Sequence, residues 1–246
     1  MKEFASVHIC AHLCRSAPLA WGPVRTLVSL DTMPNSHHFC DLVVIGASAG
    51  GLEALKGLLG SLPKDLDAAV LIAMHIGEGK TSILASVLTR FTALPIADAI
   101  DGQRLERGRV YVAIADHHLT IEKDIVRVLP SPKEGLYRPS IDTLFRSAAA
   151  AYGNRVVGVV LSGMLKDGTA GLVHITKGGG VSVVQDPNEA LESSMPESAI
   201  VGDHVQYILP VRDIAALLVR LAAACQDSPV ASSDGALVHP SPLPSP

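Results

Sequence analysis

Three polar side chains that follow apolar, strand-like segments are of the types that nucleophilic catalysis requires: Ser48, His75 and Asp167. A serine hydroxyl is a weak nucleophile at neutral pH. It needs a base that takes its proton and a third group that holds this base in the right tautomer. The three side chains fit these roles as nucleophile, base and orienting carboxylate. Their order along the chain argues against an α/β-hydrolase, in which the acidic residue precedes the histidine.

The turn that contains Ser48 fits three interpretations. Its sequence, Gly46-Ala47-Ser48-Ala49-Gly50, matches the Gly-x-Ser-x-Gly elbow that presents a catalytic serine. A glycine-rich turn between a strand and a helix is also typical of phosphate binding, although the dinucleotide fingerprint has glycine where this chain has Ser48. The third interpretation is a structural turn that carries no chemistry.

The base and the carboxylate have alternatives as well. His75 is one of ten histidines, and it fits a polar strand end as well as a catalytic base. Asp167 fits the N-cap of the helix predicted after it. Asp186 also follows a predicted strand and competes for the role of the carboxylate. A further polar cluster fits a surface loop better than a site: Asp116, His117 and His118.

The periodicity of apolar residues indicates which elements position these side chains. Strands are predicted at residues 42–45, 68–74, 94–97, 110–114, 156–161 and 181–184, and a small hairpin at 119–122 and 125–129. Helices are predicted at residues 52–59, 81–91, 140–152, 168–177, 196–200 and 211–224, with Thr81 as the N-cap of the second.

The alternation of strands and helices predicts an α/β fold, with a doubly wound, mostly parallel sheet and helices on both faces. This is a Rossmann-like arrangement of three layers. Function gathers at the carboxyl ends of the strands in such sheets. We therefore expect Ser48, His75 and Asp167, which all follow strands, to lie at this edge.

The composition suits one large α/β domain with tails. The chain has 246 residues, a net charge of -4 and 48% hydrophobic residues. The slight acidity gives no reason to expect nucleic acid as a partner. No apolar run reaches the length of a membrane span, so we expect a cytoplasmic protein without membrane insertion. The cysteines lie outside the predicted core, which favours a reducing compartment without disulfides: Cys10, Cys14, Cys40 and Cys225.

The two ends of the chain differ in composition from the middle. Residues 1–40 are predicted to be a disordered leader, and we hypothesise that translation starts at Met33. The domain is predicted at residues 41–225, and the Pro/Ser-rich residues 226–246 are predicted to be a disordered tail. The leader holds His and Cys residues whose spacing is too weak to predict a zinc site: His8, Cys10, His12 and Cys14, with His37, His38 and Cys40 as the second set.

A set of motifs in order along the chain resembles one known family. The motifs are Ile45-Gly46-Ala47-Ser48-Ala49-Gly50-Gly51, Met74-His75, Arg138-Pro139-Ser140-Ile141-Asp142-Thr143-Leu144-Phe145, Leu161-Ser162-Gly163-Met164-Leu165-Lys166-Asp167-Gly168 and Ser194-Met195-Pro196. Together they resemble the catalytic domain of CheB, the protein-glutamate methylesterase of bacterial chemotaxis. The resemblance extends from about Asp41 to Ala224. Each motif alone is weak, but the ordered set is specific.

The resemblance implies a doubly wound α/β fold and a catalytic triad: Ser48, His75 and Asp167. It favours Asp167 over Asp186 as the carboxylate. The backbone N–H groups of Met164 and Ala49 correspond to positions near the developing oxyanion. No metal ion and no organic cofactor is implied.

The implied reaction is the hydrolysis of glutamate methyl esters on a methylated chemoreceptor, at its cytoplasmic helices. Some members of the family also deamidate receptor glutamine. A chemotaxis methyltransferase of the same pathway is a further expected partner. A different class of function fits the same resemblance, namely a signalling module that binds a receptor or a partner protein without catalysis.

This chain departs from the family pattern in three respects. The residues before the first predicted strand are too few for the receiver domain that precedes the esterase in the classical enzyme, so a stand-alone esterase is expected. Ala49 occupies the position after the serine where the classical enzymes often have threonine. Leu165 occupies a position that is often glycine. The last two differences are expected to alter the fit of the substrate.

Overall fold

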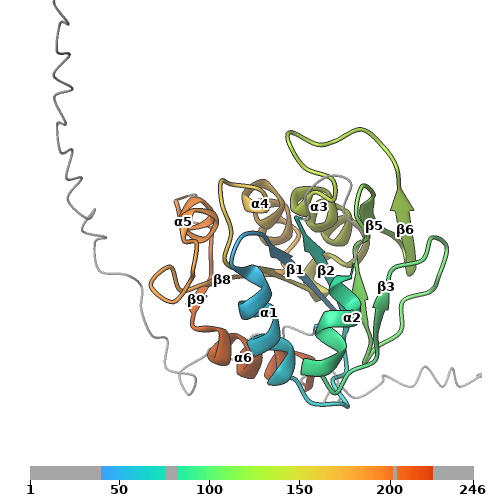
Figure 1. Ribbon diagram of the computed structural model, residues 1–246, viewed down its shortest axis with the longest axis horizontal. Coiled ribbons are helices and arrows are strands. Elements are labelled where there is room, and N and C mark those ends of the chain that lie inside the picture. Colours follow the sequence, from blue (N-terminus) through green and yellow to red (C-terminus); the bar gives the residue numbers. More distant parts are fainter. Residues whose placement is uncertain (1–39, 76–82, 202–203, 224–246) are drawn as a thin grey trace, which may run out of the picture. The chain divides into compact units, whose positions relative to one another are not determined.

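A computed structural model of the chain describes residues 40–75, 83–201 and 204–223. Its centre is a seven-stranded sheet in which every pair of neighbouring strands is parallel, with the order β3-β4-β2-β1-β7-β8-β9 (Figure 1). The strands of this sheet are β1 (Leu42–Ala47), β2 (Ala69–Met74), β3 (Ile96–Asp98), β4 (Val110–Val112), β7 (Val156–Val160), β8 (Val181–Gln185) and β9 (Tyr207–Leu209). An antiparallel hairpin forms a second sheet: β5 (His118–Glu122) and β6 (Ile125–Leu129).

Helices cover both faces of the sheet, as Figure 1 shows. On one face lie α1 (Gly51–Gly60), α2 (Leu84–Leu88), which continues as the short 3-10 helix Thr89–Phe91, and α6 (Val211–Ala223). On the other face lie α3 (Ile141–Tyr152), α4 (Thr169–Lys177) and α5 (Ser194–Ile200), and the β5–β6 hairpin packs beside α3. A 3-10 turn at Gly153–Arg155 connects α3 to β7.

The sheet lies between two apolar helix layers because its central strands are apolar on both sides. Every residue of β1 and β7 is buried. Helix α3 presents Ile141, Leu144 and Phe145 to the core, and its first turn is closed by Ser140, whose hydroxyl accepts the Thr143 N–H. This face of the core also contains residues of the hairpin and of α4 and α5.

The predicted fold class is confirmed: the sheet is parallel, doubly wound and covered on both faces. The sequence patterns do not predict strand β9, since it has only three residues at the edge of the sheet and is followed directly by Pro210. The helix predicted at 81–91 begins, within the described residues, at Leu84, and Thr81 lies outside those residues. Helix α5 begins at Ser194, two residues earlier than predicted.

The expectation that no cysteine lies in the core is wrong for Cys40. This side chain is buried two residues before β1, and burial raises the pKa of its thiol to about 12. Residues 1–39 of the predicted leader, the start at Met33, the tail and the remaining cysteines lie outside the described residues. Within the described ranges, no helix has the length and apolar character that crossing a membrane requires.

Candidate active site

The carboxyl ends of three neighbouring strands bring the predicted site residues together. Ala47, the last residue of β1, pairs in register with Met74, the last residue of β2. Ser48 and His75 are therefore neighbours across two strands, and the His75 N–H donates to the Ala47 carbonyl at 3.2 Å. β7 pairs with the other side of β1, and the loop that follows it carries Asp167. The strand order changes direction between β1 and β7: β2, β4 and β3 lie on one side of β1, and β7, β8 and β9 lie on the other. α/β sheets commonly bind ligands at such a point.

The three side chains form a continuous hydrogen-bonded chain. The Ser48 Oγ lies 3.1 Å from Nδ1 of His75, and Nε2 of His75 lies 2.8 Å from Oδ2 of Asp167. The side chains of His75 and Asp167 are 10% and 5% exposed. A carboxylate fixes the proton on Nε2, so the lone pair of Nδ1 faces the serine hydroxyl. This arrangement places a base where it can take the serine proton.

The alternative carboxylate, Asp186, does not reach His75. Its Oδ1 instead accepts the backbone N–H and the side-chain amide of Asn188, both at 2.9 Å. Asp167 is also not the N-cap of helix α4, because Gly168 occupies that position. The structure therefore excludes the N-cap interpretation of Asp167 and pairs this residue with His75.

The first turn of α3 stabilises Asp167 as a carboxylate. Its Oδ2 accepts the Ile141 N–H at 2.8 Å, while its Oδ1 accepts the Asp142 N–H at 2.9 Å and the Ser140 hydroxyl at 3.2 Å. Burial on its own raises the pKa of Asp167. The hydrogen bonds from His75, Asp142 and Ile141 outweigh burial and hold this pKa below its usual range. A helix N-terminus adds to this effect because its amide groups favour negative charge.

The loop after β1 and the loop after β7 meet around Ser48 with little space between them. The Ser48 N–H donates to the Ser162 carbonyl at 3.0 Å. A Cβ on Gly163 would lie 2.8 Å from Cβ of Ser48 and 2.3 Å from Sδ of Met195, so only glycine allows this approach. Gly50, in the other loop, has a φ of 74°, and a Cβ there would lie 2.6 Å from Oγ of Ser162.

The same two loops carry the amide groups predicted to face an oxyanion, those of Ala49 and Met164. Both residues are exposed, and within the described part of the chain their N–H groups have no hydrogen-bond partner. Leu165, which follows Met164, has a φ of 70°, and this left-handed conformation costs a non-glycine residue free energy. Its N–H donates to Oγ of Ser194 and its carbonyl accepts from Ser198, so α5 holds this loop.

An aromatic ring and a pocket border the site. The ring of Tyr137 is stacked on the imidazole of His75. A pocket of about 620 Å³ lies beside Asp167, and Leu136, Tyr137 and Leu165 contribute to its walls. The side chains of Leu136 and Leu165 are exposed and give this pocket apolar walls, while Glu134 and Lys166 add charged side chains.

Sequence reasoning missed Tyr137 and the role of the first turn of α3. Asp142 does offer a local signal, since an acidic residue two positions after the N-cap Ser140 is typical of a helix start. Tyr137 offers none, because its partner His75 lies in a distant part of the sequence. The interpretation of Asp116, His117 and His118 as a surface loop is wrong for His118. This residue is buried, its Nε2–H donates to the Pro132 carbonyl, and its Nδ1 accepts the Ser140 N–H.

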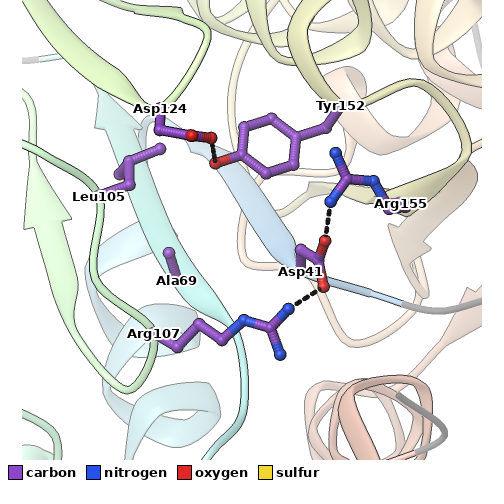
Figure 2. Close-up of a pocket in the computed structure, with 7 residues that line it drawn as sticks. All are labelled: Asp41, Ala69, Leu105, Arg107, Asp124, Tyr152 and Arg155. Carbon is purple, nitrogen blue, oxygen red and sulfur yellow. Dashed lines mark hydrogen bonds and ion pairs between the residues drawn. The ribbon is translucent and has the colours of Figure 1, made fainter. Parts of the chain in front are cut away.

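A different polar cluster lies at the opposite edge of the sheet, at the amino ends of β1 and β2. The pocket there has a volume of about 190 Å³. Figure 2 shows its lining, in which Arg107 and Arg155 both contact the buried carboxylate of Asp41. The hydroxyl of Tyr152 donates to Asp124 at 3.1 Å. The charges at this edge are paired with one another, which fits a structural role.

The described residues contain no group of His, Cys, Asp and Glu side chains that could hold a metal ion. The His and Cys residues whose spacing is too weak to predict a zinc site all lie in the first 39 residues, outside the described part, except Cys40.

Comparisons with known proteins agree with this architecture. The family described as CheB methylesterase matches residues 43–218. A relative from Leptospira interrogans is 38% identical over 182 residues, which cover 74% of this chain and 94% of that protein. A protein-glutamate methylesterase/protein-glutamine glutaminase of Rhodospirillum rubrum is 36% identical over 204 residues, 80% of this chain and 53% of that protein.

A solved structure has the same fold. The CheB methylesterase catalytic domain of Thermotoga maritima superposes with a TM-score of 0.70 and 32% sequence identity, and the match covers 74% of this chain and 98% of that chain. The family match spans most of the chain and includes the strands and loops that carry Ser48, His75 and Asp167. The chain belongs to the CheB methylesterase family.

Proposed function

We propose that this protein is a serine esterase that removes methyl groups from glutamate side chains of chemoreceptors. The observation that supports this proposal most directly is the hydrogen-bonded chain from Ser48 through His75 to Asp167. Its relatives are named protein-glutamate methylesterase/protein-glutamine glutaminase. We further propose that it acts in the cytoplasm, where the helices of a methylated receptor are its substrate.

The first half of the reaction forms an acyl-enzyme. The Ser48 Oγ attacks the carbonyl carbon of the ester while its proton moves to Nδ1 of His75. Asp167 stabilises the imidazolium through its bond to Nε2. When the tetrahedral intermediate collapses, the bond to the methoxy oxygen breaks, and His75 returns the proton to this oxygen so that methanol leaves.

The second half releases the product. A water molecule gives a proton to His75 and attacks the acyl carbon, and Ser48 regains its proton as the glutamate carboxyl group leaves. With glutamine as the substrate, the same steps release ammonia. The amides of Met164 and Ala49 are the proposed donors to the oxyanion, and such donors contribute about 3 kcal/mol each in acyl transfer.

The hydrogen bond between Ser48 and His75 also favours this proposal over a phosphate-binding loop. A phosphate loop needs no base beside a serine hydroxyl, whereas in this turn the hydroxyl of Ser48 faces Nδ1 of His75.

The test is the release of methanol from a methylated chemoreceptor. We expect turnover by the protein and none by Ser48→Ala, and the circular dichroism spectrum of the variant should be unchanged. A receptor that binds to the protein but is never demethylated would favour the non-catalytic signalling module. Full turnover by Ser48→Ala would refute the esterase mechanism.

A further inference from the structure

The imidazole of His75 is covered on one face by an aromatic ring. The ring centroids of His75 and Tyr137 lie 3.8 Å apart, and their planes differ by 1°. This is a face-to-face contact at van der Waals distance. Its geometry matters because His75 is the group that takes and returns the proton in the proposed reaction.

The position of Tyr137 is set by its own backbone rather than by His75. Tyr137 and Glu134 form an isolated antiparallel bridge, with reciprocal N–H to carbonyl bonds of 3.1 Å each. The carboxylate of Glu134 accepts hydrogen bonds from Thr143 and Arg146, which are residues of helix α3. The tight turn that carries the ring is therefore fixed to the helix whose first turn holds Asp167.

The two hydrogen bonds of His75 leave one motion of its ring unrestrained. They fix Nδ1 against Ser48 and Nε2 against Asp167, but the imidazole can still tilt about the line that joins these two nitrogens. Such a tilt turns the nitrogen lone pair and the N–H out of line with their partners, and hydrogen bonds weaken as this alignment is lost. A rigid ring against the face of the imidazole opposes the tilt.

We propose that Tyr137 is a positioning residue for the esterase reaction: its aromatic face keeps the imidazole of His75 aligned with both partners and stabilises the imidazolium formed during proton transfer. This inference rests on the proposed function. The face of a phenol ring carries partial negative charge, which attracts a cation placed over it. The stack therefore favours the charged form that appears as Ser48 loses its proton.

The ring of Tyr137, rather than its hydroxyl, carries this role. Within the described part of the chain the hydroxyl has no hydrogen-bond partner. Burial, and next the nearby charge of Asp167, raises the pKa of Tyr137, so the phenol stays neutral where the enzyme works. A phenylalanine should thus replace the tyrosine, whereas a leucine of comparable apolar character should not.

The test compares Tyr137→Phe with Tyr137→Leu in steady-state demethylation of a methylated receptor. We expect the Phe variant to keep kcat within about twofold and the Leu variant to lose about tenfold in kcat. A tenfold loss is the rate factor that corresponds to the free energy of a moderately desolvated cation–π contact. KM should change little in both, because the effect lies on the proton transfer. In proton NMR, the low-field signal of the His75 N–H that faces Asp167 should persist in the Phe variant and broaden in the Leu variant.

Tyr152→Leu is the matched control, since Tyr152 is a partly buried tyrosine in the pocket at the opposite edge of the sheet (Figure 2). It should lower thermal stability and leave kcat unchanged. Equal kcat in the Leu and Phe variants of Tyr137, or a loss that appears only in KM, would overturn the positioning role. The proposed function fails separately, if Ser48→Ala retains turnover.

Discussion

Asp167 binds the first turn of α3, in which Asp142 lies, and Asp142 in return binds the start of α4, the helix that follows Asp167. Asp167, just before α4, accepts the N–H groups of Ile141 and Asp142 in α3. Asp142, in α3, accepts the N–H of Gly168 at 3.0 Å and that of Gly171 at 2.6 Å, at the start of α4. The two helix N-termini are thus joined by a reciprocal exchange, and the carboxylate that orients His75 is part of it. The position of Asp167 therefore depends on Asp142, which does not contact His75 or Ser48.

The exchange predicts that Asp142 tolerates asparagine. Both bonds from α4 end on the same oxygen, Oδ1, which the amide of asparagine also offers. Burial, opposed in part by these hydrogen bonds, raises the pKa of Asp142, so loss of its charge is not costly. We expect Asp142→Asn to change the free energy of unfolding by at most about 1 kcal/mol, and Asp142→Ala to cost about 2 kcal/mol or more because two N–H groups lose their acceptor. Urea denaturation measures both, and equal losses would contradict the bonding scheme.

Asp167 should not tolerate the same change, because it uses both oxygens. His75 and Ile141 donate to Oδ2, while Asp142 and Ser140 donate to Oδ1. An amide nitrogen would face two donors in either orientation, and it would favour the wrong tautomer of His75. We expect Asp167→Asn to lower kcat on the order of 10⁴-fold, as tautomer loss does in a serine protease triad. Methanol release measures this, and a loss below tenfold would contradict the role of Asp167.

The same carboxylate predicts a pH dependence of stability. The pKa of Asp167 is lower in the folded protein than the value of about 3.9 for an exposed aspartate. Its carboxylate thus stabilises the fold above about pH 4, and this contribution is lost as the pH falls through the lowered pKa. The difference in free energy of unfolding between the protein and Asp167→Asn should be constant near pH 7 and shrink below about pH 4. A difference that grows on acidification would reverse the sign and refute the assignment.

Much of the fold follows from patterns of short range. The buried strands around Val44 and Val159 are apolar runs, and the helices between them have apolar faces, so the parallel sheet and its layers were predictable. The edge strand β9 was not, because three half-buried residues have no periodicity to detect. The positions of the strand ends predicted Ser48, His75 and Asp167 at one edge of the sheet without knowledge of any contact.

The rest of the site depends on contacts between distant segments. Asp167 precedes a helix, so local spacing left an N-cap as an alternative to the predicted catalytic carboxylate, but a carboxylate can bind the amides of any helix that folds against it. His75 and Asp167 are 92 positions apart, and no sequence pattern near either residue predicts its contact with the other. The stack of Tyr137 on His75 is equally non-local, so no local sequence pattern predicts it.

Leu165 should be a position where glycine is accepted and a branched residue is not. Its φ of 70° is left-handed, and its side chain is exposed, so little burial is lost on substitution. Leu165→Gly removes strain of about 1 kcal/mol and adds a similar entropy to the unfolded chain. We expect its free energy of unfolding to stay within about 0.5 kcal/mol of the parent, and that of Leu165→Val to fall by about 1 kcal/mol or more. Urea denaturation compares the two, and a Val variant as stable as the Gly variant would show that the strain is absent.

Gly163 should be intolerant of any side chain, because of its contact with the serine. A Cβ there would lie 2.3 Å from Sδ of Met195 and 2.8 Å from Cβ of Ser48. Met195 can move its flexible side chain, but Cβ of Ser48 is fixed to the backbone, so the two loops must separate. We expect Gly163→Ala to lower kcat by at least about 100-fold, since displacement of a reacting group by 1 Å has this effect. The double variant Gly163→Ala, Met195→Ala gives room at the sulfur alone. It should recover stability in thermal denaturation without recovering kcat, and recovery of both would place the conflict at Met195 rather than at Ser48.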